Sequence, residues 1–466
     1  MDLPFTTGYY IDEDSMSANV ECTNCIPEAY SIGGTTKQKL RNASGISLFS
    51  TAGTKFSRGI ESLNELVYEV AGNTLYRIDA DGTNTDLGTI DGSGRVSMAA
   101  SALELCIVVP GVKGYIYSVS AGLTAITDTT YTGNLSLQVE YKDGYFLHVT
   151  GAKLFKSNLN DGLTYDALDF ASAEALPDKI TSIMVSRNQL YIGGVETIEP
   201  FQNIGGAGFP YQRVNGGVVP MGVKAKFSLV NFARTFAFVG NAENENPSVY
   251  LFTGSTPERI ATNAIDLIIG EHTDDEKKSI FCTAYAERGG FFLNVHFKNR
   301  TMTYDRQTTL WHERTSKDVN GKQTNWRVSG IVSAYGKILV IDNQSGRVGV
   351  MDKDTLTEYG TSIKRVWATI PFSNQGERIS FSDFEITMLN GTGNASDVEP
   401  EVMRSFSDDG GRAFKNETAR SLGKEGEYKK RQIWRREGDS PRHRMYRFVH
   451  DSPTKFAVMA LTADVQ

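Results

Sequence analysis

The sequence predicts a mainly β protein: a β-propeller of seven blades, a C-terminal antiparallel β-sandwich and an extended N-terminal arm. Three observations lead to this architecture. The 466 residues include 45 Gly, 20 Tyr and 24 Phe, and glycine turns with aromatic residues favour β-strands. A strand–turn–strand unit recurs seven times along the middle of the chain. The composition then changes near residue 363, which indicates a second folded unit.

Residues 1–54 form the predicted arm. They are polar and irregular and end in GGTTKQKLRNASG at 33–45. We expect them to lie over another surface or to supply a strand that closes the ring of blades. The start, MDLPFTTGYYIDED, lacks a basic region followed by an apolar core, so no signal peptide is expected. No apolar stretch approaches about 18 residues, so no membrane insertion is expected.

Residues 55–362 contain the repeat and form the predicted propeller. The repeat begins with LVYEVAGNTLYRIDADG at 66–82 and ends with KILVIDNQSGRVGVMDKDT at 337–355. Successive hairpin turns are 40, 38, 43, 50, 55 and 46 residues apart, at Asn73, Lys113, Gly151, Gly194, Asn244, Asn299 and Ser345. Spacings of about 40–50 residues are typical of propeller blades, which bury their apolar faces against one another. A β-sandwich or two stacked β domains with accidental spacing stays open as the alternative.

Two short helices are expected within this region. NAIDLIIG should form one that ends at Gly270. In HTDDEKKSIF, Thr273 and Glu276 have the spacing of a capping box, which predicts a helix beginning there.

Residues 363–466 form the predicted sandwich. The segments RVWATIPF, ISFSDFEITML, EPEVMRSFS, RQIWRRE, RMYRFVH and KFAVMAL read as its strands. Residues 401–466 hold 14 Lys and Arg against 10 Asp and Glu, a net charge of +4. The whole chain carries −7, so the preceding 400 residues carry −11. So acidic a chain is a poor candidate for tight nucleic-acid binding, although it does not exclude contact with passing double-stranded DNA without sequence specificity.

The stretch SFSDDGGRAF at 405–414 raises the question of sugar chemistry. Ser407, Asp409, Gly411 and Phe414 have the spacing of the Asp-box turn of sialidase propellers. In such turns the Ser and Asp side chains bind backbone N–H groups and the Gly takes a positive φ. A sialidase also needs an arginine cluster, a nucleophilic Tyr and an acidic pair, so we expect a structural turn without catalytic residues.

The cysteine and glycine motifs predict no cofactor and no metal. Four cysteines are too few for a disulfide framework in a chain of this length, which fits a reducing compartment. Cys22 and Cys25 form a Cys-x-x-Cys without the second pair that a zinc site needs. GSGRVSMA at 92–99 lacks the Lys-Ser/Thr of a phosphate-binding loop and is interpreted as a turn entering a blade.

The run YKKRQIWRREGDSPRHRMYRF at 428–448 is the strongest charged feature. It predicts strands with alternating faces: Arg431 and Arg435 lie with Ile433 on one side, and Trp434 and Arg436 on the other. Solvated strands, a subunit or partner interface and direct nucleic-acid contact are the three interpretations. Arg and Trp favour the interface. Its candidate residues are Arg431, Trp434, Arg435, Arg436, Arg442 and Arg447.

Several segments resemble the packaged-DNA stabilisation proteins of short-tailed bacteriophages, also called tail hub or tail nozzle proteins. They are YIDEDSMSANV (10–20), SRGIESLNELVYEVAGNTLYRID (57–79), GSGRVSMA (92–99), PSVYLFTGSTPERIATNAIDLII (247–269) and RQIWRREG (431–438). Their order and approximate spacing match across nearly the whole chain. VECTNC at 20–25 has no counterpart that can be placed, and most of the intervening sequence is not obviously similar.

The resemblance implies a structural protein of the virion tail, made and assembled in the host cytoplasm. Such proteins form a ring, usually a homohexamer, below the portal and its adaptor ring. They extend the DNA channel, hold the packaged genome, and contact a tail needle or plug and tail fibres or spikes. The family has no catalytic residues to transfer. The alternatives are a propeller glycosidase or carbohydrate-binding module and a propeller scaffold of non-viral origin.

Overall fold

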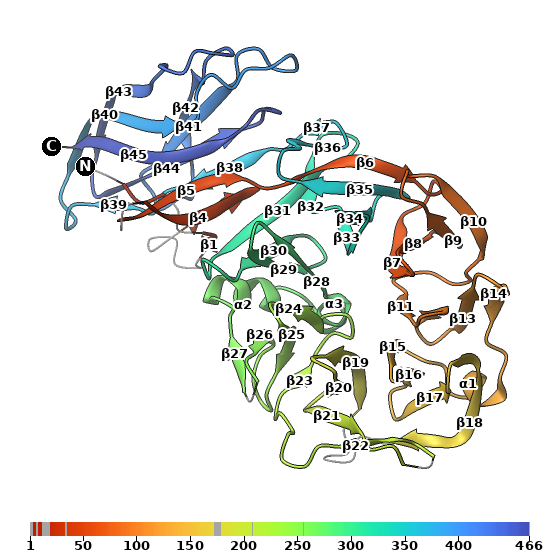
Figure 1. Ribbon diagram of the computed structural model, residues 1–466. Coiled ribbons are helices and arrows are strands. Elements are labelled where there is room, and N and C mark those ends of the chain that lie inside the picture. The colour runs from red at the N-terminus through yellow and green to blue at the C-terminus, as the bar shows by residue number, and fades with distance from the viewer. Residues whose placement is uncertain are drawn as a thin grey trace.

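The computed structural model describes residues 3–5, 8–11, 19–32, 35–171, 179–206, 208–254 and 256–465. Strands dominate this part of the chain (Figure 1). Its helices are short: α1 (Thr129–Thr132), α2 (Asn263–Gly270) and α3 (Asp274–Ser279). The mainly β class predicted from composition is therefore confirmed.

Seven groups of antiparallel strands form the blades of a propeller. Blade 1 contains β7 (Ser57–Leu63), β8 (Leu66–Ala71), β9 (Thr74–Ile78) and β10 (Asn84–Thr89). Blade 2 contains β11 (Ser97–Ala100), β12 (Glu104–Val109), β13 (Lys113–Ser118) and β14 (Gly122–Ala125). Blade 3 contains β15 (Gln138–Lys142), β16 (Tyr145–Val149), β17 (Leu154–Asn158) and β18 (Asp161–Ala171).

Blades 4 to 6 continue the same order. Blade 4 contains β19 (Ile180–Ser186), β20 (Gln189–Gly194), β21 (Ile198–Asn203) and β22 (Tyr211–Arg213). Blade 5 contains β23 (Gly222–Val223), β24 (Val230–Phe232), β25 (Thr235–Asn241), β26 (Ser248–Phe252) and β27 (Pro257–Arg259). Blade 6 contains β28 (Phe281–Glu287), β29 (Gly290–His296), β30 (Thr301–Asp305) and β31 (Trp311–Lys317), with β32 (Gln323–Asn325) paired to β31.

Blade 7 is completed by a strand from the N-terminal arm. Its first three strands are β33 (Val328–Ala334), β34 (Lys337–Asp342) and β35 (Arg347–Asp352). The fourth is β6 (Gly45–Thr51), which pairs antiparallel with β35. Since β33 also packs against β7 of blade 1, the ring is closed and the seven-bladed propeller is confirmed. β6, which lies before the first blade in the sequence, thereby completes the last blade.

The turns identified in the repeat join the second and third strands of each blade. The turn at Asn73 joins β8 to β9, and the turn at Ser345 joins β34 to β35. These two strands are the middle of the sheet and are mostly buried, which is why their apolar runs are the clearest part of each repeat. The helix predictions are also confirmed: α2 ends at Gly270, and Thr273 and Glu276 form a complete capping box at α3.

The C-terminal sandwich borrows two strands from the arm. One sheet has the order β4 (Cys25–Ile32), β5 (Thr35–Asn42), β45 (Ala457–Val465), β40 (Ile379–Met388) and β43 (Gln432–Ser440). The other contains β38 (Arg365–Ala368), β44 (His443–His450), β41 (Glu401–Ser407) and β42 (Lys415–Ser421), with β39 (Phe372–Ser373) paired to β44. Each of the six segments expected to form a strand does so. The places of β4, β5 and β42 in the sandwich were not foreseen.

One further strand joins the propeller and the sandwich into a continuous sheet. β3 (Cys22–Thr23) lies between β31 of blade 6, to which it is parallel, and β38, to which it is antiparallel. The remaining short strands are β1 (Tyr10–Ile11) paired with β2 (Asn19–Val20), and β36 (Thr357–Glu358) paired with β37 (Thr361–Ser362).

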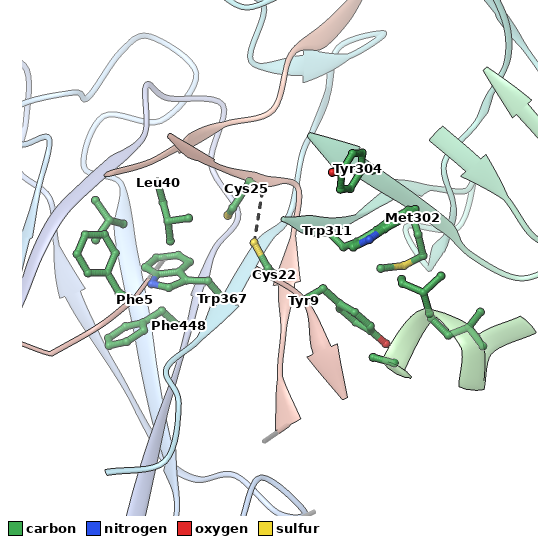
Figure 2. Close-up of a cluster of buried hydrophobic side chains, with 14 of the residues drawn as sticks. Phe5, Tyr9, Cys22, Cys25, Leu40, Met302, Tyr304, Trp311, Trp367 and Phe448 are labelled. Atoms are coloured by element: carbon green, nitrogen blue, oxygen red, sulfur yellow. Dashed lines mark hydrogen bonds between the residues drawn. The ribbon is translucent and has the colours of Figure 1, made fainter. Parts of the chain in front are cut away.

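The largest buried cluster spans this junction. Figure 2 shows Phe5 and Leu40 of the arm beside Trp367 and Phe448 of the sandwich, and Tyr9 beside Trp311 and Met302 of blade 6. The arm therefore forms part of the core between the two units. Both described ends of the chain lie beside the sandwich, where the Leu3 backbone N–H donates to the Leu461 carbonyl at 2.9 Å (Figure 1).

Candidate interaction surfaces

The Asp-box-like turn after β41 is held by its own side chains. The Ser407 hydroxyl accepts the Gly411 backbone N–H at 2.9 Å and donates to Asp409 Oδ1 at 2.6 Å. The same carboxylate oxygen accepts the Ala413 N–H at 3.1 Å. The hydrogen bond from Ser407 lowers the pKa of Asp409. Gly411 has a φ of +89°, a conformation that favours glycine. The polar groups of this turn are used to fix its backbone.

Phe414 and Arg447 connect the turn to the arm. Phe414 is half-buried, and the Arg447 guanidinium carbon lies 5.5 Å from the centre of its ring. Arg447 also forms an ion pair with Glu21 at 2.6 Å. Asn19 of β2 donates to the Gly411 carbonyl at 3.1 Å. Phe414 and Arg447 therefore take part in contacts within the subunit.

Trp434 belongs to the core of the sandwich. It is 1% exposed, and its ring centre lies 6.0 Å from that of Phe384 and 6.2 Å from that of Phe448. The prediction that Trp434 belongs to an interface is therefore wrong, because its side chain is inaccessible to another protein. The bulky indole fills space between the two sheets, where a large apolar side chain is stabilising.

The predicted alternation along β43 breaks after Arg435. Arg435 pairs with Asp383 of β40, whereas Phe381 pairs with Gly438, so one extra residue on β43 forms a β-bulge. Arg436 in this bulge has a φ of +58° and is exposed. The expectation that Arg436 shares the face of Trp434 is therefore wrong, since a bulge reverses the side on which the following residue lies.

Half of the basic side chains in the run are neutralised within the subunit. Arg431 donates two hydrogen bonds to the Glu385 carboxylate, at 2.8 and 2.6 Å. Buried Arg444 contacts Asp408 at 2.7 Å. Within the described part of the chain, Arg435, Arg436 and Arg442 are exposed and form no ion pair. Of the residues predicted to form the interface, these three arginines are the ones that stay exposed and without an ion pair in the described structure.

Cys22 and Cys25 are buried thiols at the junction between propeller and sandwich. The Cys22 thiol donates to the Cys25 carbonyl at 3.5 Å (Figure 2). Burial raises the pKa of Cys22 and raises that of Cys25 to about 12. Because the thiolate is the nucleophile and metal ligand, burial makes both groups unreactive. Among the described residues, no group of three or more His, Cys, Asp or Glu side chains is placed to hold a metal ion.

The axis of the propeller is filled by side chains. Arg95, just before β11, donates to the Ser329 carbonyl of blade 7 at 2.6 Å and lies 4.3 Å from the ring centre of Phe281 in blade 6. Gln138 of blade 3 donates to the Lys226 carbonyl at 2.7 Å. The cavity that remains beside Arg95 is about 220 Å³, far too small for duplex DNA. GSGRVSMA, which contains Arg95, enters blade 2 as predicted.

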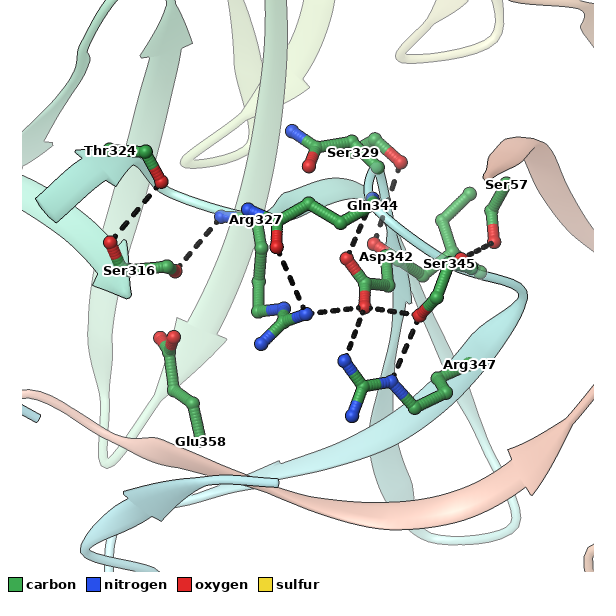
Figure 3. Close-up of polar contacts among 12 residues, drawn as sticks. Ser57, Ser316, Thr324, Arg327, Ser329, Asp342, Gln344, Ser345, Arg347 and Glu358 are labelled. Atoms are coloured by element: carbon green, nitrogen blue, oxygen red, sulfur yellow. Dashed lines mark hydrogen bonds and ion pairs between the residues drawn. The ribbon is translucent and has the colours of Figure 1, made fainter. Parts of the chain in front are cut away.

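A buried polar network holds blade 7 against blade 1. Figure 3 shows Asp342 between two arginines; it contacts Arg327 at 2.8 Å and Arg347 at 3.3 Å. Ser57 of blade 1 donates to Glu69 and to the Ser345 carbonyl. Burial raises the pKa of Glu69 to about 8, so its carboxyl favours the neutral form. The sequence analysis did not predict this network, because Ser57 and Glu69 of blade 1 are far in the chain from Asp342 and Ser345 of blade 7.

The chain forms a closed propeller with a filled axis, and strands of the N-terminal arm join this propeller to a β-sandwich. It is therefore a β-propeller–β-sandwich protein. Two family models match it in that order. The model described as bacteriophage P22 Gp10, beta-propeller, matches residues 1–356, and the model described as bacteriophage P22 Gp10, beta-sandwich, matches residues 364–466. The chain belongs to the bacteriophage P22 Gp10 family, which confirms the resemblance to phage tail hub proteins.

A curated relative agrees with the family models. The tail hub protein gp10 of Salmonella phage P22 is 24% identical over 413 residues, which cover 82% of each chain. By this relationship the chain is a structural protein of a phage tail and a component of the virion.

Solved structures that match the chain are distantly similar to it. The WD40 β-propeller domain of Doa1 has a TM-score of 0.41 and 11% identity, covering 66% of this chain and 97% of that one. The extracellular domain of BT4673 from B. thetaiotaomicron has a TM-score of 0.44 and 11% identity, covering 81% and 47%. Separately, no helix in the described residues is long and apolar enough to span a membrane.

Proposed function

We propose that the chain assembles into a ring, a homohexamer, which continues the DNA channel below the portal and its adaptor and retains the packaged genome. The observation that carries the proposal is the match of both family models, together spanning nearly the whole chain, with a relative named as a tail hub. We further propose that the ring contacts the portal-adaptor ring, a tail needle or plug, and tail fibres or spikes. In this proposal we divide the chain into the arm (1–54), the propeller (55–362) and the sandwich (363–466).

The filled axis of the propeller supports a channel made by several copies. With Arg95 and Gln138 crossing the centre, a single subunit offers no path for DNA. The passage has to lie between subunits placed around a common axis. The −11 charge of residues 1–400 suits a lumen that repels phosphate and lets the genome slide.

The exposed arginines of the sandwich are the proposed subunit or partner interface. Arg435, Arg436 and Arg442 carry charges that the described residues do not neutralise, and arginine is favoured at protein–protein contacts. The charge reversal R435E/R436E should block ring assembly or docking to the tail, while the circular dichroism spectrum and the unfolding midpoint stay close to those of wild type. R431E is a contrasting control, since it disrupts an existing internal ion pair with Glu385.

Two measurements test the proposal. Electron microscopy of tails assembled with wild-type chain should show a ring around the DNA path, and R435E/R436E tails should lack the ring or the structures attached to it. Normal tails from R435E/R436E would overturn the assignment of the interface. A lumen lined by Lys and Arg would overturn the proposed repulsion of DNA.

We also propose that the protein catalyses no reaction. Ser407 and Asp409 are hydrogen-bonded within their own turn, which supports a structural role for the Asp-box-like sequence. Purified protein should leave sialyl and galactosyl reporter substrates intact. Hydrolysis that is lost on a single substitution would contradict this.

A further inference from the structure

Three blades present arginines on the same face of the propeller. The innermost strands of all blades run in the same direction, so the turns that follow them emerge on one face. In blade 4 this turn contains Arg187, in blade 5 Arg234 and in blade 6 Arg288, and all three side chains are exposed. The Arg187 Nε donates to the Arg234 carbonyl, which ties the first two turns together. Within the described residues, none of these arginines forms an ion pair.

The backbone of these turns does not favour arginine. Arg187 and Asn188 have φ values of 49° and 62°, and Ala233 and Arg234 have 48° and 65°. Two-residue hairpin turns of this kind prefer Asn-Gly, because a side chain in the left-handed region is strained. The fold alone would be better served by glycine at Arg234. Strained residues with exposed charges point to a role outside the packing of the subunit.

The two linked turns border a depression of about 490 Å³. Its lining includes the aromatic side chains Phe232, Tyr285 and Phe291, with Arg187 and Arg234 beside them. Among the described residues that line it, none is Asp or Glu. An apolar hollow bordered by cations is therefore present in a region of the chain whose overall charge is −11.

The cations are confined to one part of the face. Of the corresponding turns in the other blades, those of blades 1 and 3 contain the carboxylates Glu65 and Asp143, and those of blades 2 and 7 contain no charged residue. Positive charge is therefore concentrated around blades 4 to 6, next to the depression.

We propose that this depression binds an extended acidic segment of another tail protein, with an apolar side chain of that segment entering the hollow. Arginine clusters recognise acidic motifs by charge-assisted hydrogen bonds. Duplex DNA fits less well, since it needs many phosphate contacts and the surrounding domain repels it. The proposal goes beyond the ring and its channel and holds whether or not the ring forms.

The test is binding of labelled probes to the full-length chain, followed by fluorescence anisotropy. The first probe is a twelve-residue peptide of alternating Glu-Glu-Leu and Glu-Glu-Phe triplets. The second replaces each Glu by Gln, and the third is a 20-base-pair DNA duplex. R187G/R234G removes both charges with a residue that tolerates positive φ. The control K322G/K424G removes two exposed lysines that do not line the depression.

We expect the acidic peptide to bind wild type and K322G/K424G equally and R187G/R234G at least about tenfold more weakly, while the Gln peptide does not bind. S333E provides a second variant, because Ser333 is exposed in the lining and both arginines are retained. It should also weaken binding at least about tenfold. Absence of peptide binding to folded wild type, equal binding by R187G/R234G, or binding of the duplex in preference to the peptide would each overturn the proposal.

Discussion

Protonation of Glu69 should make the stability of the propeller depend on pH. The side chain is fully buried where blade 1 meets blade 7, one of its oxygens accepts from Ser57, and the other has no partner. Burial, with a smaller contribution from nearby Asp342, raises the pKa of Glu69 from 4.5 to about 8. Folding therefore favours the protonated carboxyl, and the substitution Glu69→Gln replaces it with a group that stays neutral.

The sign and size of the effect follow from the two pKa values. Below pH 4.5 the carboxyl is protonated in both states and its contribution is fully present. Between pH 4.5 and 8 the unfolded chain releases the proton and the folded chain keeps it. Stability then falls by about 1.4 kcal/mol per pH unit, with an upper limit of about 5 kcal/mol for the whole loss.

Urea unfolding followed by circular dichroism at pH 5, 6, 7 and 8 measures this slope. Glu69→Gln should be close to wild type at pH 5 and more stable at pH 8. Glu65→Gln, which changes an exposed glutamate in the turn that precedes β8, is the control and should keep the wild-type slope. Parallel pH dependences for wild type and Glu69→Gln would refute the assignment of a neutral buried carboxyl.

Three further predictions test the closure of the ring and the strained turns. Asp342→Ala leaves Arg327 buried without its partner and should cost about 3–5 kcal/mol in unfolding free energy, whereas Arg347→Ala should cost far less; equal losses would contradict this. Gly349→Ala places a Cβ 2.1 Å from Ile46 Cγ2 and should lower the unfolding free energy by about 1–3 kcal/mol. Ile46→Ala in the same chain should relieve part of this loss. Strictly additive losses would show that Ile46 of β6 does not contact the new methyl group of β35. Arg234→Gly should raise stability by about 1 kcal/mol at its positive φ, and a lower melting temperature would count against the proposed strain.

The surface arginines show how far strand periodicity can be taken. Alternation along β43 correctly separated Arg431 and Arg435 from the side that holds Trp434, but it gave no information about partners. Whether Arg431 is free depends on Glu385, which lies 46 residues earlier and meets it only across the sheet. The bulge at Arg436 likewise depends on the register with β40.

The N-terminal arm shows a different limit. Its residues lack a repeat and bury their apolar side chains against two separate units, so local patterns do not predict their partners. β6 completes blade 7, β4 and β5 extend the sandwich, and β3 lies between β31 and β38. Each of these pairings joins segments that are far apart in the sequence.

The amino-acid sequence by itself determined the mainly β class, the number of blades, the strands of the sandwich, the helices α2 and α3 and the phage tail family. These follow from local periodicity, turn residues and short matching segments, all of which are properties of neighbouring residues. Only the tertiary structure decided that the arm closes the ring, that Trp434 is core, that half of the basic run is paired, and that Arg187 and Arg234 border an apolar hollow. Those features depend on which distant side chains meet, and contact between distant residues is set by the packing of the whole chain.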